Sequence, residues 1–112
     1  MNQTFFTGRF TRDPELRQTL KGDPVLHFTL AVQRRRAKEN TEEITDFIPC
    51  VAWNGRAEKI AKMGKKSKSI FVSGIMTSRD MMQEDGSRSR RLEMRVDSFS
   101  FLEPMRFVAE EE

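Results

Sequence analysis

The stretch from Thr45 to Arg79, TDFIPCVAWNGRAEKIAKMGKKSKSIFVSGIMTSR, carries most of the information about the fold. It contains a strand, a short basic helix and a second strand. Side chains of a strand alternate, so Phe47 and Trp53 lie on one face of the first strand. Two exposed rings on one face would form a platform on which unpaired bases stack. Two buried rings would instead belong to the core.

The composition is that of one folded domain. The chain has 112 residues, of which 37% are hydrophobic and 33% are charged. The net charge of +3 is unevenly distributed: residues 34–95 carry fifteen basic and nine acidic side chains, whereas residues 96–112 carry one and five. The middle of the chain is therefore where a polyanion would bind. The alternative is a solvated surface that happens to be basic.

The sequence offers little for catalysis. Cys50 is the only cysteine, so an internal disulfide is excluded and a small buried apolar role is expected. The single histidine, His27, is expected in a structural or surface role. No metal-ligand spacing and no phosphate-binding glycine loop occur, so we expect neither an enzyme nor a cofactor. The start, MNQTFF, lacks the features of a signal peptide and no apolar run reaches membrane-spanning length, which predicts a cytoplasmic protein without a membrane partner.

Alternation and turn signals predict an all-β chain with one helix. The strands are expected over Thr4–Arg12, Leu26–Gln33, Thr45–Trp53, Ser69–Met82 and Arg88–Leu102, with further extended pairing near Leu16–Thr19. A short helix is expected over Ala57–Met63, after a turn at Asn54-Gly55 and before a stop at Gly64. A helix between the third and fourth of five strands is the order of the OB-fold, a Greek-key barrel. The predicted domain covers residues 1–103, and residues 104–112 form an acidic tail.

Individual residues add detail to the strand predictions. Pro49 has no N–H, so it predicts an edge, a bulge or a gap in pairing. Gly8 indicates a bulge or a close approach. Leu92, Met94 and Val96 alternate with charged residues, so the three apolar side chains are expected to share one face of the strand and the charged ones the other.

An OB-fold binds oligonucleotides on its second and third strands, together with the loop after the first strand and the loop between the fourth and fifth. This placement favours Phe47 and Trp53 as stacking residues. Arginines and lysines around them are expected to neutralise phosphates, which requires no exact geometry. These candidates are Arg34, Arg35, Arg36, Arg56, Lys59, Arg79, Arg88, Arg90 and Arg91. The alternative for each is an ordinary surface cation.

Four blocks of sequence occur in a fixed order: GRFTRDPELRQT (residues 8–19), PVLHFTLAVQRR (24–35), TDFIPCVAWNGRAEKIA (45–61) and SIFVSGIMTSRDMMQEDG (69–86). Together they resemble the bacterial single-stranded DNA-binding protein family, from Met1 to about Glu103. The resemblance implies an OB-fold subunit of a homotetramer that wraps single-stranded DNA without sequence preference. It also implies that residues 2–6 pair with a partner subunit.

The resemblance also implies four aromatic stacking positions, of which two are kept as Phe47 and Trp53. The third falls on Arg36 and the fourth on Met81, and tyrosine is absent from the chain. Weaker binding is expected, because stacking is worth roughly 1–3 kcal/mol per base. Arg36 can recover part of this by lying flat on a base or pairing with phosphate, and Met81 by a softer apolar contact.

Longer family members end in a flexible linker and an acidic tip with a Pro-Phe pair that recruits replication and repair enzymes. The last residues here, FVAEEE, contain neither, so the chain resembles a short form and recruitment through the tail is not expected. The leading hypothesis is binding and protection of single-stranded DNA in replication, recombination, repair or DNA uptake. The alternatives are a primosomal or recombination accessory protein of the same fold that acts through protein contacts, and an RNA-binding OB module.

Overall fold

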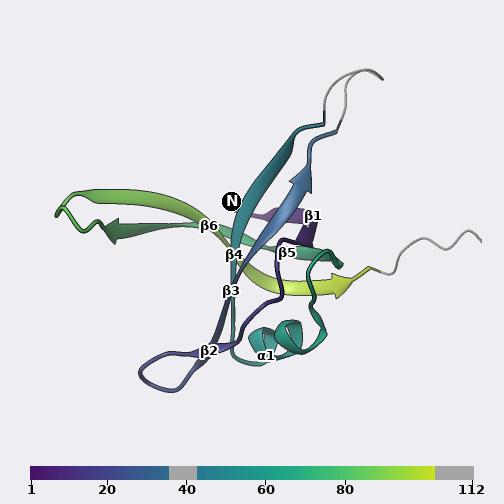
Figure 1. Cartoon of the computed structure of the whole chain (residues 1–112), viewed down its shortest axis with the longest axis horizontal. Helices are drawn as coiled ribbons and strands as arrows, with labels where there is room; N and C mark the ends of the chain where they lie inside the picture. The colour runs from purple at the N-terminus through teal and green to yellow at the C-terminus, as the bar shows by residue number, and fades with distance from the viewer. Residues whose placement is uncertain (36–42, 103–112) are drawn as a thin grey trace, which may run out of the picture.

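The strands of this protein curl into a barrel around one apolar core (Figure 1). The structure is a computed structural model and describes residues 1–35 and 43–102. In this part of the chain the elements are β1 (Thr4–Phe10), β2 (Arg17–Gln18), β3 (Pro24–Gln33), β4 (Thr45–Trp53), α1 (Asn54–Met63), β5 (Ser69–Met82) and β6 (Arg88–Phe101). The predicted boundary between a domain at 1–103 and a tail at 104–112 lies outside the described residues.

The sheet order is β1-β5-β6-β4-β3-β2, and β1 closes the barrel by also pairing with β3. The pairings are antiparallel except for β4 with β6, which run parallel. Leaving aside the two-residue β2, this is the predicted OB-fold. The predicted extended segment near residues 16–19 is confirmed as β2, while β1 ends at Phe10 rather than at Arg12.

Apolar residues from every long strand and from α1 fill the barrel. The largest fully buried side chains include Phe10, Leu26, Leu30, Ile60 and Ile70. The ring of Phe10 packs against those of Phe28 and Phe101, with centroids 5.3 and 6.1 Å apart. Cys50 is buried among them, as predicted.

Two single-residue predictions are confirmed. Pro49 pairs with Thr29 of β3, but on its other side the β4–β6 ladder contains only the pairs that begin at Cys50 and Val51. The missing N–H therefore falls where β4 has no partner on that side. Gly8 is a close approach: a Cβ there would lie 2.7 Å from the carbonyl oxygen of Ala31.

Leu92, Met94 and Val96 share one face of β6 as predicted, but they differ in burial. Leu92 is 62% exposed, whereas the other two are buried. The reason is that β5 and β6 continue past the barrel as a two-stranded arm (residues 78–92), where no third element covers the inward-facing side (Figure 1). A bulge opposite Ser73 and Gly74 then shifts the alternation of β6.

The helix begins earlier than predicted. Asn54 and Gly55, expected as a turn, form its first residues, and Asn54 has a positive φ of 56°. The helix ends at Met63 as predicted, but Gly64 is extended (φ −78°), so it is not a left-handed cap. Glycine is needed there for space, because a Cβ would lie 2.8 Å from the Ile60 carbonyl oxygen and 2.9 Å from Pro14 Cγ. No helix in residues 1–35 and 43–102 has the length and apolarity to cross a membrane.

Candidate nucleic-acid interface

Two aromatic rings stand on the outer face of β4. Phe47 is 64% exposed and Trp53 is 37% exposed, so neither belongs to the core. Six residues of strand separate them, which corresponds to about 20 Å at roughly 3.3 Å per residue. Neither ring stacks on another ring among the described residues. We call this outer face of β3 and β4 the ring face.

The neighbours on β3 explain the difference in exposure between the two rings. Phe47 stands opposite Ala31, whose small side chain leaves the ring uncovered. Trp53 stands opposite Val25, which is buried, and it directly precedes α1. Cross-strand neighbours of this kind fix the orientation of a ring on a sheet. Trp53 is therefore partly supported by the protein and partly open to solvent. Val51, which alternates to the same side of β4 between the two rings, is only 3% exposed.

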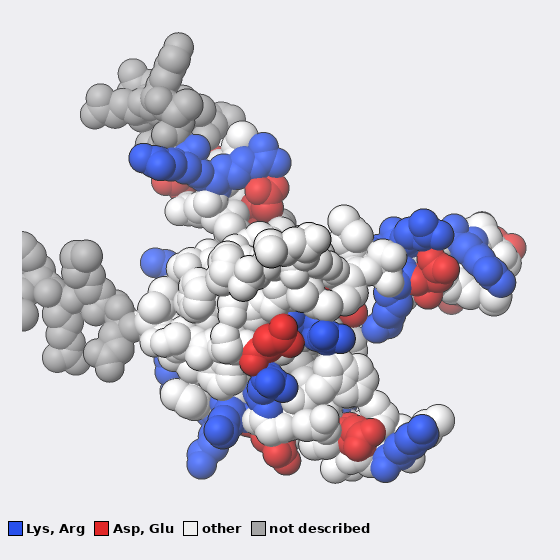
Figure 2. All heavy atoms as spheres, turned by 180° about the vertical axis from the view of Figure 1, so that it is seen from behind, with Lys and Arg blue, Asp and Glu red and all other residues white. Residues whose placement is uncertain are grey.

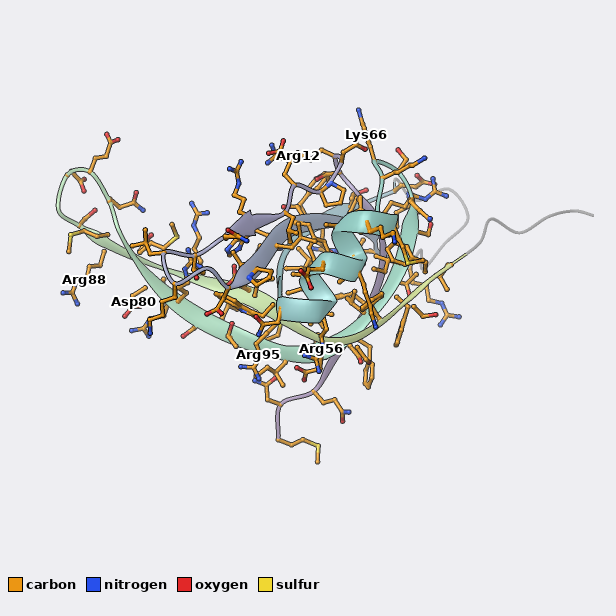
Figure 3. All side chains as sticks on the ribbon, turned by 90° about the horizontal axis from the view of Figure 1, so that it is seen from below. Arg12, Arg56, Lys66, Asp80, Arg88 and Arg95 are labelled. Carbon is orange, nitrogen blue, oxygen red and sulfur yellow. The ribbon has the colours of Figure 1, made fainter. Side chains whose placement is uncertain are left out.

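A groove of about 330 Å³ lies beside these rings. Its lining residues come from the segment between β1 and β2 and from β3, β4 and β6: Arg12, Asp13, Pro14, Glu15, Arg17, His27, Phe28, Thr29, Pro49, Cys50 and Glu93. Pro49 lies between Phe47 and Trp53 along β4, so the groove and the rings are parts of one surface. The wall is anchored by Asp13, whose carboxylate accepts a hydrogen bond from the backbone N–H of Lys66 at 2.7 Å. Figure 3 shows Arg12 and Lys66 on the same side of the molecule.

Charges of both signs line the groove. Arg17 forms a 3.0 Å ion pair with Glu15, whereas Arg12 forms no ion pair with any described residue. The side chain of Glu93 is only 16% exposed, and its carboxylate lies 3.5 Å from His27 Nδ1 and 3.8 Å from Arg79 Nη1. Arg12 is thus a cation available to a phosphate or a base in the groove.

Cys50 is not a nucleophile in this groove. Burial, and secondarily the nearby charge of Glu93, raises the pKa of the Cys50 thiol to about 12. The thiol is therefore protonated at neutral pH, and thiolate chemistry is not available there. No group of three or more potential metal ligands occurs in the residues that the structure describes.

The arm divides its predicted cationic residues between two sides. Arg79 and Met81 pair in register with Arg91 and Ser89, on the side that also carries Glu93. Because Glu93 lines the groove, this side of the arm is continuous with the groove. Met81 is half-buried.

Arg88 and Arg90 alternate to the opposite side of the arm, where Arg90 Nε lies 3.1 Å from Asp80 Oδ1. Figure 3 shows Arg88 and Asp80 on the arm, well away from α1, and Figure 2 shows that basic side chains gather along the arm. These two arginines therefore belong to a different surface from Arg79 and Arg91.

Other predicted phosphate contacts are engaged with the protein or lie elsewhere. Arg34 holds both oxygens of Asp46, at 2.8 and 3.0 Å, and this hydrogen-bonded pair lowers the pKa of Asp46 and raises that of Arg34. Arg56 donates to the carbonyl oxygen of Asp97. In Figure 3 Arg56 lies beside Arg95, on the side of the molecule away from Arg12.

The remaining predicted residues are less constrained. Arg35 and Lys59 are exposed, at the end of β3 and on α1. Arg36 lies outside the described residues.

Sequence reasoning did not single out Arg12, Arg17 and Glu93, and it gave His27 only a structural or surface role. The signal for Arg12 and Arg17 was present, because they lie in the loop after the first strand, where OB-folds contact ligands. Glu93 carried no comparable signal. It appeared as one charged residue of an alternating strand, and only the curvature of β6 brings it to the groove.

A second surface also exposes an aromatic ring. Phe5 of β1 is 57% exposed and stacks on Phe71 of β5, with ring centroids 6.1 Å apart. Ser73 and Ser98 hydrogen bond to each other on the adjoining strands. We call the surface around Phe5 and Phe71 the Phe5 face.

The barrel, the ring face and the groove together define an OB-fold protein with a surface suited to nucleic acid. Comparison with known proteins makes this specific. The model of the "Single-strand binding protein family" matches residues 1–102. The chain belongs to this family.

Its relatives include the "Single-stranded DNA-binding protein" of Bacillus cereus, 41% identical over 93% of this chain and 61% of the relative. "Single-stranded DNA-binding protein A" of Bacillus subtilis is 39% identical over 93% of this chain and 60% of the relative. The chain thus spans about three fifths of the length of these curated relatives. The solved structure "Plasmodium falciparum SSB complex with ssDNA" has a TM-score of 0.80 and 21% identity, covers 92% of this chain and 96% of that chain, and confirms the fold.

Proposed function

We propose that this protein binds single-stranded DNA without strong sequence preference and protects it during replication, recombination, repair or DNA uptake. The observation that carries the proposal is the pair of exposed rings, Phe47 and Trp53, on the face that adjoins a groove lined by Arg12, which forms no ion pair with a described residue. The names of the relatives agree with it. Protection follows because an occupied strand is covered by protein.

Binding would combine two contributions. Bases stack on Phe47 and Trp53 and make a softer contact with Met81, each ring contributing roughly 1–3 kcal/mol per base. Phosphates are neutralised by cations on the same side, foremost Arg12, Arg79 and Arg91, with release of counterions. The other predicted cations, namely Arg34, Arg35, Arg36, Arg56, Lys59, Arg88 and Arg90, are proposed to contribute less, as general positive charge.

We also propose that the protein is a homotetramer in the cytoplasm, associated with the nucleoid. Two features of the structure support self-association. In the described residues β1 pairs with β3 only at Arg9 and Phe10, so the edge of β1 from Thr4 to Gly8 is open on that side. An open edge is a template for pairing with another chain. The Phe5 face adds an exposed aromatic ring, stacked on Phe71, next to this edge.

The test is the fluorescence of Trp53 during titration with oligo-dT at low and high salt. Trp53 is the only tryptophan and tyrosine is absent, so the signal has one source. We expect saturable quenching that weakens as salt rises. Binding by fluorescence anisotropy of a labelled oligonucleotide without quenching would contradict the role of Trp53. Absence of binding by both measurements would contradict the function and favour an accessory protein that acts through protein contacts.

A further inference from the structure

We propose that the groove is a subsite for a nucleobase that presents two adjacent N–H donors, namely guanine, and that Glu93 is its acceptor. This inference rests on the proposed function and adds a local base preference to it. A carboxylate on the binding surface is otherwise unfavourable, because it repels the phosphates that the surface has to attract.

The state of the Glu93 carboxylate is the first argument. It is largely buried, yet no described residue donates a hydrogen bond to its oxygens. The nearest cationic nitrogens, on His27 and Arg79, are 3.5 and 3.8 Å away. Charge-assisted hydrogen bonds to a carboxylate are about 2.7–2.9 Å long, so both contacts are loose. An ionised carboxylate has about four acceptor positions, and those of Glu93 remain available towards the groove.

Base chemistry gives the second argument. Guanine carries an N1–H and an N2–H₂ side by side, so it can donate two parallel hydrogen bonds to one carboxylate. Thymine has a single N–H between two carbonyls, which would face the carboxylate unfavourably. Cytosine and adenine each offer one amino group beside a ring acceptor. Guanine also presents O6 and N7 as acceptors, for which arginine is the usual partner.

The groove supplies groups for both edges of guanine. Glu93 lies at its β6 side, and Arg12, which has no ion-pair partner among the described residues, lines its β1–β2 side. Pro49 lies between Phe47 and Trp53 on β4 and also lines the groove. Pro49 is two residues from Phe47, so a base adjoining one stacked on Phe47 is positioned to enter the groove. The volume of about 330 Å³ is within the range of small-molecule sites.

The experiment compares three oligonucleotides of equal length: dT alone, dT with spaced dG, and dT with dI at the same positions. Inosine lacks the N2 amino group but keeps N1–H and O6, so it removes one of the two donors. We expect the wild-type chain to bind the dG oligonucleotide roughly fivefold more tightly than the dI one. Glu93→Gln keeps the size and shape of the side chain but leaves only one acceptor oxygen. This variant should therefore bind the dG and dI oligonucleotides equally. Glu84→Gln is the matched control, because Glu84 is an exposed carboxylate on the same hairpin outside the groove.

The outcomes are distinguishable. Equal affinity of the wild-type chain for dG and dI would overturn the proposal, and this comparison does not depend on the folding of any variant. A Glu93→Gln variant that binds all three oligonucleotides more tightly by the same factor would also overturn it, because Glu93 would then act only as a repelling charge. If the wild-type chain binds none of them, the proposed function itself fails. If it binds dT but gains nothing from dG, only the subsite fails.

Discussion

The ring face and the Phe5 face both expose aromatic side chains, but they present them differently. On the ring face, Phe47 and Trp53 stand about 20 Å apart, and neither stacks on another ring among the described residues. Arg12 and Arg17 of the β1–β2 segment line the groove that adjoins them at Pro49. On the Phe5 face, the exposed ring already stacks on Phe71.

This difference suggests different partners. A base needs a free ring face and a nearby cation for its phosphate, and the ring face offers both. A second copy of the chain needs apolar area and an open strand edge, which the Phe5 face offers together with β1. Exposure of an aromatic ring alone does not distinguish a surface for a base from a surface for a second copy of the chain.

The largest effect is expected from a substitution that destabilises the barrel and therefore both surfaces. Gly74 lies where the bulge shifts the alternation of β6, and a Cβ there would overlap the carbonyl oxygen of Arg95. Gly74→Ala should therefore lower the free energy of unfolding by about 3 kcal/mol or more. The measurement is chemical denaturation followed by Trp53 fluorescence. Gly55→Ala is the control, since a Cβ there meets nothing within 4 Å, and a similar decrease in stability in both variants would contradict the steric argument.

The role of Gly74 illustrates what the sequence could and could not predict. Alternation in residues 24–33 and 45–53 predicted β3 and β4 closely, because each strand has one face in the core. The order of strands and helix predicted the OB-fold. The exposure of Leu92 could not be predicted, because alternation reports which side a residue takes and not whether anything covers that side. Glu93 was missed for a related reason: its place in the groove depends on the pairing and curvature of β6.

The next largest effect should fall on DNA binding alone. The double variant Phe47→Ala/Trp53→Ala removes both free rings and should weaken binding to labelled oligo-dT by about 2 to 6 kcal/mol, since each stacked base is worth roughly 1–3 kcal/mol and distant sites add. Anisotropy of the labelled oligonucleotide is the measurement, because the tryptophan is gone. Phe5→Ala is the matched control on the other face and should leave affinity for a short oligonucleotide unchanged. Equally weakened binding in both variants would remove the distinction between the two faces.

A reciprocal change should alter assembly and spare binding. Phe5→Glu places a charge on the Phe5 face beside the open edge of β1, so we expect the proposed tetramer to dissociate into smaller species in sedimentation velocity. Affinity for a short oligonucleotide should stay within about twofold, as for surface changes worth under roughly 0.5 kcal/mol. Phe47→Glu should do the opposite, leaving the sedimentation coefficient unchanged. An assembled Phe5→Glu variant would show that another surface holds the subunits together.

The smallest expected effect tests whether the ring face extends along the arm. Arg79→Ala/Arg91→Ala and Arg88→Ala/Arg90→Ala remove the same charge from the same hairpin, but from opposite sides. For a single strand, each phosphate that is no longer neutralised should reduce the slope of log K against log salt by about 0.7, so the slope of the first variant should fall by about 1.4. The slope of the second should fall by less, because Arg90 is paired with Asp80 and both arginines face away from the groove side. The slopes are measured by titration at several salt concentrations. Equal reductions would mean that the arm attracts DNA through its net positive charge. Unequal reductions would mean that the register of β5 and β6 selects which arginines contact the strand.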